Sequence, residues 1–217
     1  MRTHLSSVSV RRWDHNAYYH RLLLRQLPAR LERALDVGCG AGTFAGTLAG
    51  RAADVDAVDS STAMVETARR RVPSNVHVVL GDVMEMSPPA DSYDAITSIS
   101  VLHHLPLPEA LARLAGWLRP GGVLAGVALP RVDLPRELPI EALGGAGNLI
   151  LGAGFAGLRR AGAGRWYEVE PTHALMPVTD PTLTVREVRR LAQKTLPRAQ
   201  VRRLAFWRYL LVWHHPG

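Results

Sequence analysis

The chain is poor in cysteine, and it has no long apolar run. Its 217 residues include a single cysteine, Cys39, which excludes an intramolecular disulfide framework. The histidines have no zinc-like spacing, so we expect no metal site. We find no apolar span of about 18 residues and no signal-peptide pattern, which predicts a cytoplasmic protein without membrane contact. The stretch 142–158 is apolar, but it is diluted by glycine and too short to span a bilayer.

Lysine is almost absent, although the chain is basic. Lys194 is the single lysine, yet the formal net charge is +7 because arginine supplies nearly all the positive charge. A basic chain invites the hypothesis of an RNA substrate. However, the arginines are scattered apart from the runs 69–71 and 186–208, and an arginine-rich helix face is usually a solvated surface. We therefore expect no nucleic-acid partner, and an RNA-modifying enzyme remains the alternative.

The order of segments predicts one α/β domain over residues 1–217, with an N-terminal helical segment at 1–30. Strand-like and helix-like segments alternate, which is typical of a parallel sheet with helices on both faces. The expected strands are 33–37, 54–58, 76–80, 94–99 and 122–129, and the expected helices are 13–27, 42–50, 62–71 and 107–117.

Residues 130–183 interrupt this alternation. They are rich in proline and glycine, and we expect them to form a lid inserted between the fifth and sixth strands. Thr184 and Glu187 have the spacing of a capping box, which predicts the start of a final helix. Two closing strands are expected at 201–206 and 209–213.

A glycine-rich turn follows the first expected strand. Gly38, Gly40 and Gly42 allow backbone amides to approach a ligand where any Cβ would clash. The helix that begins near Thr43 then points its positive end at that ligand. Asp59 ends the next strand, where a carboxylate can accept both hydroxyls of a ribose. The pattern predicts a ligand of nucleotide type, although the glycine spacing is tighter than in the dinucleotide fingerprint.

Three further segments extend this pattern. Residues 80–83 (Leu-Gly-Asp-Val) follow the third strand, 91–106 run from the fourth strand into a loop, and 118–122 open the fifth strand. In this order and spacing, residues 33–129 resemble the class I S-adenosylmethionine-dependent methyltransferases, and 206–213 resemble the last hairpin of that family. The resemblance implies a Rossmann-like α/β fold whose sheet is seven-stranded and mostly parallel, with an antiparallel last strand. It also implies S-adenosylmethionine as the cofactor.

The resemblance assigns cofactor contacts to particular residues. The backbone at Gly38, Cys39 and Gly40 would hold the methionine portion, with Asp36 orienting the turn. Asp59 would bind the ribose hydroxyls. The other expected cofactor residues are Ser60 and Met64 at the adenine pocket, Asp82 and the Val83 amide at the adenine edge, Ser98 facing the sulfonium, and Tyr18 on the N-terminal helix.

His103 and His104 are the expected catalytic residues. They stand where the fourth strand passes into a loop, at the edge where open α/β sheets bind ligands. A histidine there can remove a proton from a hydroxyl or an amine near neutral pH. The alternative is that one of the pair caps the next helix or packs on the cofactor. Ser100 would share this loop, and His173 in the expected lid is a separate candidate.

The methyl acceptor carries no motif of its own. We expect a small molecule with an oxygen, nitrogen or carbon nucleophile, because Leu149, Phe155 and Trp166 suit an apolar pocket, and we expect a monomer or homodimer. A competing NAD(P)-binding oxidoreductase would use Gly152–Gly157, which matches G-x-G-x-x-G after the strand-like residues 149–151. Too little chain follows for the rest of that fingerprint, so we interpret this segment as part of the lid.

Overall fold

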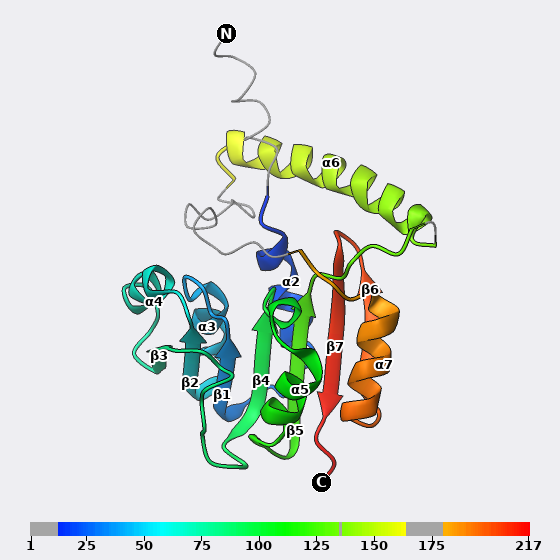
Figure 1. The fold of residues 1–217 in the computed structure, drawn as a ribbon. Helices are drawn as coiled ribbons and strands as arrows, with labels where there is room; N and C mark the ends of the chain where they lie inside the picture. Colours follow the sequence, from blue (N-terminus) through cyan, green and yellow to red (C-terminus); the bar gives the residue numbers. More distant parts are fainter. Residues whose placement is uncertain (1–12, 135, 164–179) are drawn as a thin grey trace.

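The computed structural model describes residues 13–134, 136–163 and 180–217, which form a seven-stranded sheet with helices on both faces (Figure 1). The strand order is β3-β2-β1-β4-β5-β7-β6. The strands are β1 Leu31–Val37, β2 Ala52–Asp59, β3 Val76–Leu80, β4 Tyr93–Ile99, β5 Leu118–Ala128, β6 Gln200–Leu204 and β7 Arg208–His214.

Parallel pairing joins the first five strands. β1 lies between β2 and β4, with Asp36 opposite Ala57 on one side and Thr97 on the other. The C-terminal halves of β1 and β2 are buried at successive residues, because helices cover both faces of the sheet. The buried halves are apolar apart from Asp36 and Asp56. β7 runs antiparallel between β5 and β6, so the expected sheet with an antiparallel last strand is confirmed.

The helices form two layers around the sheet. α2 and α3 share an apolar core with one face, which includes Leu23 and Phe44. α5 and α7 share a second core with the other face, which includes Leu111 and Val188. α4 packs on β2 and β3 at one edge of the sheet. The helices are α2 His15–Leu24, α3 Thr43–Leu48, α4 Thr62–Arg69, α5 Leu107–Ala115, α6 Leu138–Arg160 and α7 Val185–Thr195.

Two helix starts are defined by side-chain caps. The Asp14 carboxylate accepts hydrogen bonds from the amides of Asn16 and Ala17, which starts α2. At α7 the expected capping box is present, since the Glu187 amide donates to Thr184 Oγ1 and the Thr184 amide donates to the Glu187 carboxylate. Both caps satisfy amides that no helical carbonyl can reach.

The insertion between β5 and β6 contains the long helix α6, which lies across the end of the sheet where the parallel strands terminate (Figure 1). The hypothesis of a strand at 149–151 with a glycine turn at Gly152–Gly157 is wrong, because both segments lie inside α6. Helical amides bond to carbonyls one turn earlier, so these glycines form no phosphate-binding turn. Trp166 and His173, which sequence analysis placed in the lid, lie outside the described residues.

A cluster of aromatic side chains attaches α6 to the domain. Trp13 packs edge-on against Phe155 of α6 and against Phe206 at the tip of the β6–β7 hairpin. Its indole nitrogen donates a 2.9 Å hydrogen bond to Asn148 Oδ1. Phe206 and Trp207 both have positive φ values, +53° and +58°, which is uncommon for bulky residues. This turn conformation places Phe206 in the cluster, which packs α6 against the domain.

Candidate active site

The glycine turn after β1 is built from backbone hydrogen bonds to the neighbouring strand. The amides of Gly38 and Cys39 both donate to the carbonyl of Val58, at 2.8 and 3.0 Å. Gly38 has a φ of +70° and Gly42 a φ of +81°, so both occupy the left-handed region that favours glycine. The turn therefore leads the chain tightly from β1 into α3, and the start of α3 faces the edge of the sheet.

Asp59 connects the end of β2 to this turn. One carboxylate oxygen accepts the Gly40 amide at 2.8 Å, and the other accepts the Ser61 amide at 2.9 Å. A carboxylate has about four lone-pair sites, so two hydrogen bonds leave capacity for a ligand's hydroxyls. Asp59 is thus held in one orientation and also braces the glycine turn.

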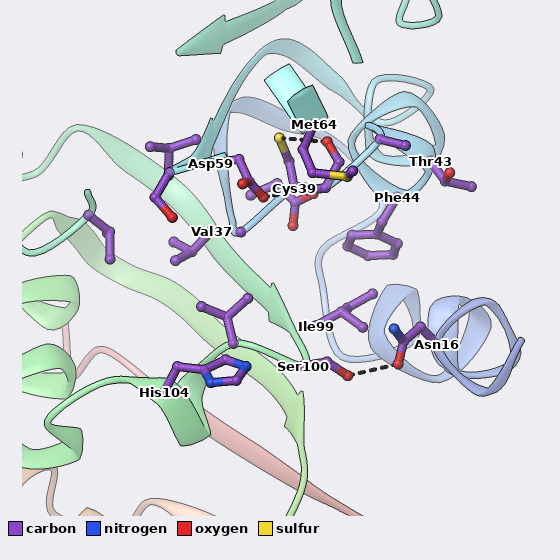
Figure 2. A pocket seen from close by; sticks show the side chains of 18 of the residues that line it. Asn16, Val37, Cys39, Thr43, Phe44, Asp59, Met64, Ile99, Ser100 and His104 are labelled. Atoms are coloured by element: carbon purple, nitrogen blue, oxygen red, sulfur yellow. Dashed lines mark hydrogen bonds between the residues drawn. The ribbon is translucent and has the colours of Figure 1, made fainter. Parts of the chain in front are cut away.

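A cavity of about 360 Å³ opens at this edge of the sheet (Figure 2). The glycine turn, the end of β2 and the start of α4 form one side. Asn16 of α2 and Ser100 after β4 form the other side, beside His104. Among the predicted cofactor residues, those that line the cavity are Asp36, Gly38, Cys39, Gly40, Asp59, Ser60, Met64, Asp82 and Val83.

Three predicted site residues lie off the cavity wall. Tyr18 packs edge-on against Trp13 and Phe206 in the aromatic cluster. Ser98 is completely buried near the end of β4. His103 stacks beside His104, with ring centroids 3.9 Å apart, and of the two only His104 lines the cavity. Any direct contact of these three residues with a ligand would therefore require the site to rearrange.

The wall of the cavity is acidic. Four carboxylates line it, and none of its described lining residues is a lysine or an arginine. An anionic pyrophosphate would find no basic side chain here, whereas a ligand with a sulfonium and an ammonium group would be attracted. The apolar side chains of Met64 and Val83 could flank a flat ring, and both are buried. The residues therefore fit S-adenosylmethionine better than a dinucleotide. The four carboxylates are Asp14, Asp36, Asp59 and Asp82.

Burial raises the pKa of the Asp36 carboxyl to about 7. A hydrogen bond from Thr97 Oγ1, at 2.9 Å, acts in the opposite direction but does not offset the loss of water. The charge of Asp59 raises the pKa further. The carboxyl beneath the glycine turn is thus half-protonated near neutral pH, and a cationic ligand would favour its ionised form.

Replacing Asp36 by asparagine is expected to change how stability depends on pH. Because the native pKa is above the ordinary 3.8, the native state holds a proton that the unfolded state loses, so wild-type stability falls as pH rises from about 4 to 7. A three-unit shift corresponds to at most about 4 kcal/mol. Asp36→Asn should therefore gain stability relative to wild type at about pH 8 and little at about pH 5. Urea unfolding of the ligand-free protein measures this, and equal differences at both pH values would contradict it.

Cys39 is a structural member of the turn. Its side chain is buried, and burial together with the nearby Asp36 and Asp59 raises the pKa of the thiol far above its ordinary value. A protonated, buried thiol is a poor nucleophile. This agrees with the interpretation of Cys39 as a small residue that fits a crowded turn.

Sequence analysis missed a group of cavity residues on the N-terminal side. Asn16 and His20 come from α2, and Phe44 comes from the first turn of α3. The ring of His20 packs on Phe44 with centroids 4.9 Å apart, and burial lowers the pKa of His20 to about 4. The Asp14 cap could have been recognised from the sequence. No local sequence pattern, however, predicts that α2 packs over the edge of the sheet.

Both expected catalytic histidines are neutral at physiological pH. Burial lowers the pKa of His103 to about 4, and the nearby His104 and Arg208 lower it further. Burial also lowers the pKa of His104, which remains more exposed. A neutral imidazole can accept a proton, so His104 on the cavity wall has the right form and position to do so.

The fold and the cavity together define a class of protein. A Rossmann-like sheet ends in a glycine turn, an acidic strand end and an acidic cavity, which is the arrangement expected of a methyltransferase that binds a cationic cofactor. Residues 34–122 match the family model described as a methyltransferase domain. An uncharacterised methyltransferase of Mycobacterium tuberculosis is 31% identical over 206 residues, covering 94% of this chain and 98% of that protein. The chain therefore belongs to the S-adenosylmethionine-dependent methyltransferase family.

Two further comparisons cover different shares of the chain. The N-methyltransferase NodS from Bradyrhizobium japonicum, solved with S-adenosylhomocysteine, is 18% identical with a TM-score of 0.60, covering 93% of this chain and 87% of NodS. At this identity the likeness concerns the fold. A trans-aconitate 2-methyltransferase of Mycolicibacterium gilvum is 37% identical over 134 residues, covering 60% of this chain and 51% of that enzyme.

Proposed function

We propose that this enzyme transfers a methyl group from S-adenosylmethionine to a small-molecule acceptor that enters beside α2. The observation that supports this most directly is the position of Asn16. Its side chain lines the cavity opposite the glycine turn, at the side that the expected cofactor residues leave free (Figure 2). A cavity of about 360 Å³ suits a compact acceptor rather than a polymer backbone.

The Asn16 amide is held by two donors. Ser100 Oγ donates to Asn16 Oδ1 at 2.7 Å, and Arg208 donates to the same oxygen at 3.3 Å. With the oxygen engaged, the amide nitrogen is the group that turns away from Ser100 (Figure 2). It can then donate a hydrogen bond to an oxygen of the acceptor. Ser100 has a φ of +59°, a strained conformation of the kind often found at functional sites.

In this proposal each cofactor residue on the cavity wall contacts a particular part of S-adenosylmethionine. The backbone at Gly38, Cys39 and Gly40, whose amides bond within the domain, and the carboxyl of Asp36 would lie against the amino-acid end, while Asp59 binds the ribose hydroxyls. The rest of the adenosine would lie against Ser60, Met64, Asp82 and the Val83 amide. When bound, S-adenosylmethionine supplies an already activated methyl group. The protein therefore has to align the acceptor and exclude water.

His104 is the proposed proton acceptor for substrates with a hydroxyl or an amine. It lines the cavity within the same loop as Ser100, and its lowered pKa keeps it neutral. His103, which is off the cavity wall, would act by packing against His104. An acceptor that is already ionised, such as a carboxylate, would need no base at all.

The RNA alternative gains no support from the arrangement of the arginines. It would need Arg189, Arg190, Arg202 and Arg203 to contact phosphates. Arg189 instead donates to the Val201 carbonyl, and Arg203 donates to the Arg208 carbonyl. These two guanidinium groups hold the C-terminal part of the domain together. We therefore keep the small-molecule proposal for the whole chain, with residues 1–217 as one domain and 130–183 as its lid. No described residue of 130–183 lines the cavity, however, and Leu149, expected at an apolar pocket, is exposed.

Replacing Asn16 by alanine is expected to slow methyl transfer while leaving cofactor binding intact. The amide lies on the acceptor side, so the thermal shift caused by S-adenosylhomocysteine should remain and NAD should cause none. Transfer of labelled methyl to a panel of small carboxylic acids, phenols and amines should fall by about tenfold to a hundredfold, the cost of one or two lost hydrogen bonds. Gln200→Ala, at an exposed amide side chain on β6 outside the cavity, is the control. Methylation of RNA but of no small molecule would contradict the proposal.

A further inference from the structure

The outer side of α6 is apolar and exposed. Its inner side faces the domain through Asn148, Phe155 and the buried Ala156. On the opposite side, Leu143 and Ile150 expose 73% and 71% of their surface, which is far above what a core residue shows. Alanines occupy the positions between these side chains. The face thus consists of Ala142, Leu143, Ala146, Leu149, Ile150 and Ala153, which recur at helical spacing.

A surface helix ordinarily carries charged or polar residues on its outer side. Between residues 142 and 158 the sequence contains no charged residue, and Asn148, its one polar side chain, is turned inward. The helix has 23 residues, which corresponds to a length of about 35 Å. The apolar face itself covers residues 142–153, about 18 Å of this length, and its exposure to water is costly, so it indicates a binding surface.

The charge around this strip is positive at its C-terminal end. Arg159 and Arg160 occupy the last turn of α6. At the other end, the acids Asp133 and Glu137 are engaged in ion pairs with Arg136 and Arg203. The whole protein carries a formal net charge of +7. An apolar helix face bordered by arginines, on a basic protein, is complementary to a lipid surface with anionic headgroups.

We propose that α6 docks on an anionic lipid surface, lying in its plane with the Leu143–Ile150 side inserted. The helix does not need to leave the domain, because its inner side keeps the Trp13 and Phe155 contacts. A second copy of the chain would place two bodies of charge +7 face to face, which charge repulsion disfavours. An anionic lipid surface is therefore the better partner for the outer face of α6.

This proposal revises the sequence-based expectation of no membrane contact. That expectation treated residues 142–158 as too short, whereas the helix runs from Leu138 to Arg160. By length and composition α6 is the one helix of the described residues that could cross a membrane. Its attachment to the domain favours surface binding over spanning. Because α6 lies across the sheet end that carries the cavity, docking would place the acceptor side next to the lipid (Figure 1).

Vesicle flotation of the full-length protein tests the proposal. Wild-type protein should float with vesicles of phosphatidylcholine and phosphatidylglycerol, and about tenfold less with phosphatidylcholine alone. The double variant Leu149→Glu, Ile150→Glu should bind the anionic vesicles about tenfold or more weakly, because both side chains lose their apolar insertion. Arg160→Glu should weaken binding to the anionic vesicles only.

The control and the thermal-shift readout separate docking from folding and catalysis. Val79→Glu changes a side chain on β3 that is 40% exposed, and it should float like wild type. Stabilisation by S-adenosylhomocysteine should persist in every variant, so a failure of docking leaves the proposed function untouched. Wild-type protein that does not float, or a double variant that floats equally well, would overturn the proposal. A dimer by light scattering that the double variant abolishes would assign the face to a second copy and also overturn it.

Discussion

Replacing Asp59 by alanine is expected to weaken binding of S-adenosylmethionine by about tenfold to several hundredfold. The carboxylate is held by the Gly40 and Ser61 amides and has capacity left for ribose hydroxyls. Each hydrogen bond to a charged group contributes about 1.5–3 kcal/mol. The variant loses the ribose contacts and also leaves the Gly40 amide without its partner. Isothermal titration calorimetry with S-adenosylmethionine measures the change.

Asp54→Ala is the matched control for this experiment. Asp54 is an exposed carboxylate on the same strand, and it pairs with His77 far from the glycine turn. Exposed pairs of this kind contribute little, so the control should keep both affinity and stability. Unchanged affinity in Asp59→Ala, or an equal loss in both variants, would contradict the role proposed for Asp59.

Replacing Gly38 by alanine is expected to destabilise the folded protein by about 2–5 kcal/mol. At a φ of +70°, an L-residue costs about 1–2 kcal/mol. The added Cβ would also overlap Cγ2 of Val101, and such overpacking costs about 1–3 kcal/mol. Because Gly38 and Val101 both line the cavity, cofactor binding should weaken as well. Urea unfolding and calorimetry measure the two effects.

Two further variants separate the causes of this destabilisation. Gly38→Ala combined with Val101→Ala should recover the steric part but keep the backbone cost. Gly46→Ala, in α3, is the control, because its nearest non-local atom would be 3.8 Å away and alanine is the better helix former. It should be as stable as wild type or more stable by about 0.5–1 kcal/mol. A Gly38→Ala protein of wild-type stability would show that the turn adapts to a side chain.

Local chemistry was enough to predict most elements of the fold. The apolar run before Gly38 predicted β1, and the Thr184–Glu187 spacing predicted the start of α7, because strand burial and helix capping depend on neighbouring residues. The secondary structure of the insertion was harder to predict. Residues 149–157 are glycine-rich and apolar, and short apolar runs fit a strand or a helix equally well until their tertiary contacts are known.

The candidate site shows the same difference between what local spacing predicts and what tertiary packing decides. Asp59 and the glycine turn were found by spacing, because parallel strands bring their carboxyl ends to one edge, and both line the cavity. Tyr18 and Ser98 were also expected at the cofactor, yet Tyr18 packs in the aromatic cluster and Ser98 is buried in the sheet. Which face of a helix or strand turns toward a ligand depends on how the element packs.

The sequence by itself determined the family, the alternation of strands and helices, and the acidic glycine-rich edge, because each depends on short-range spacing. Only the tertiary structure brought Asn16 against Ser100, across 84 positions of the chain, and the proposed acceptor side rests on this contact. It alone showed that Leu143 and Ile150, on the outer face of α6, are exposed within the part of the chain that the structure describes. Both features depend on long-range packing. Contacts between distant segments produce no repeating pattern in the sequence of either segment, so they could not be predicted locally.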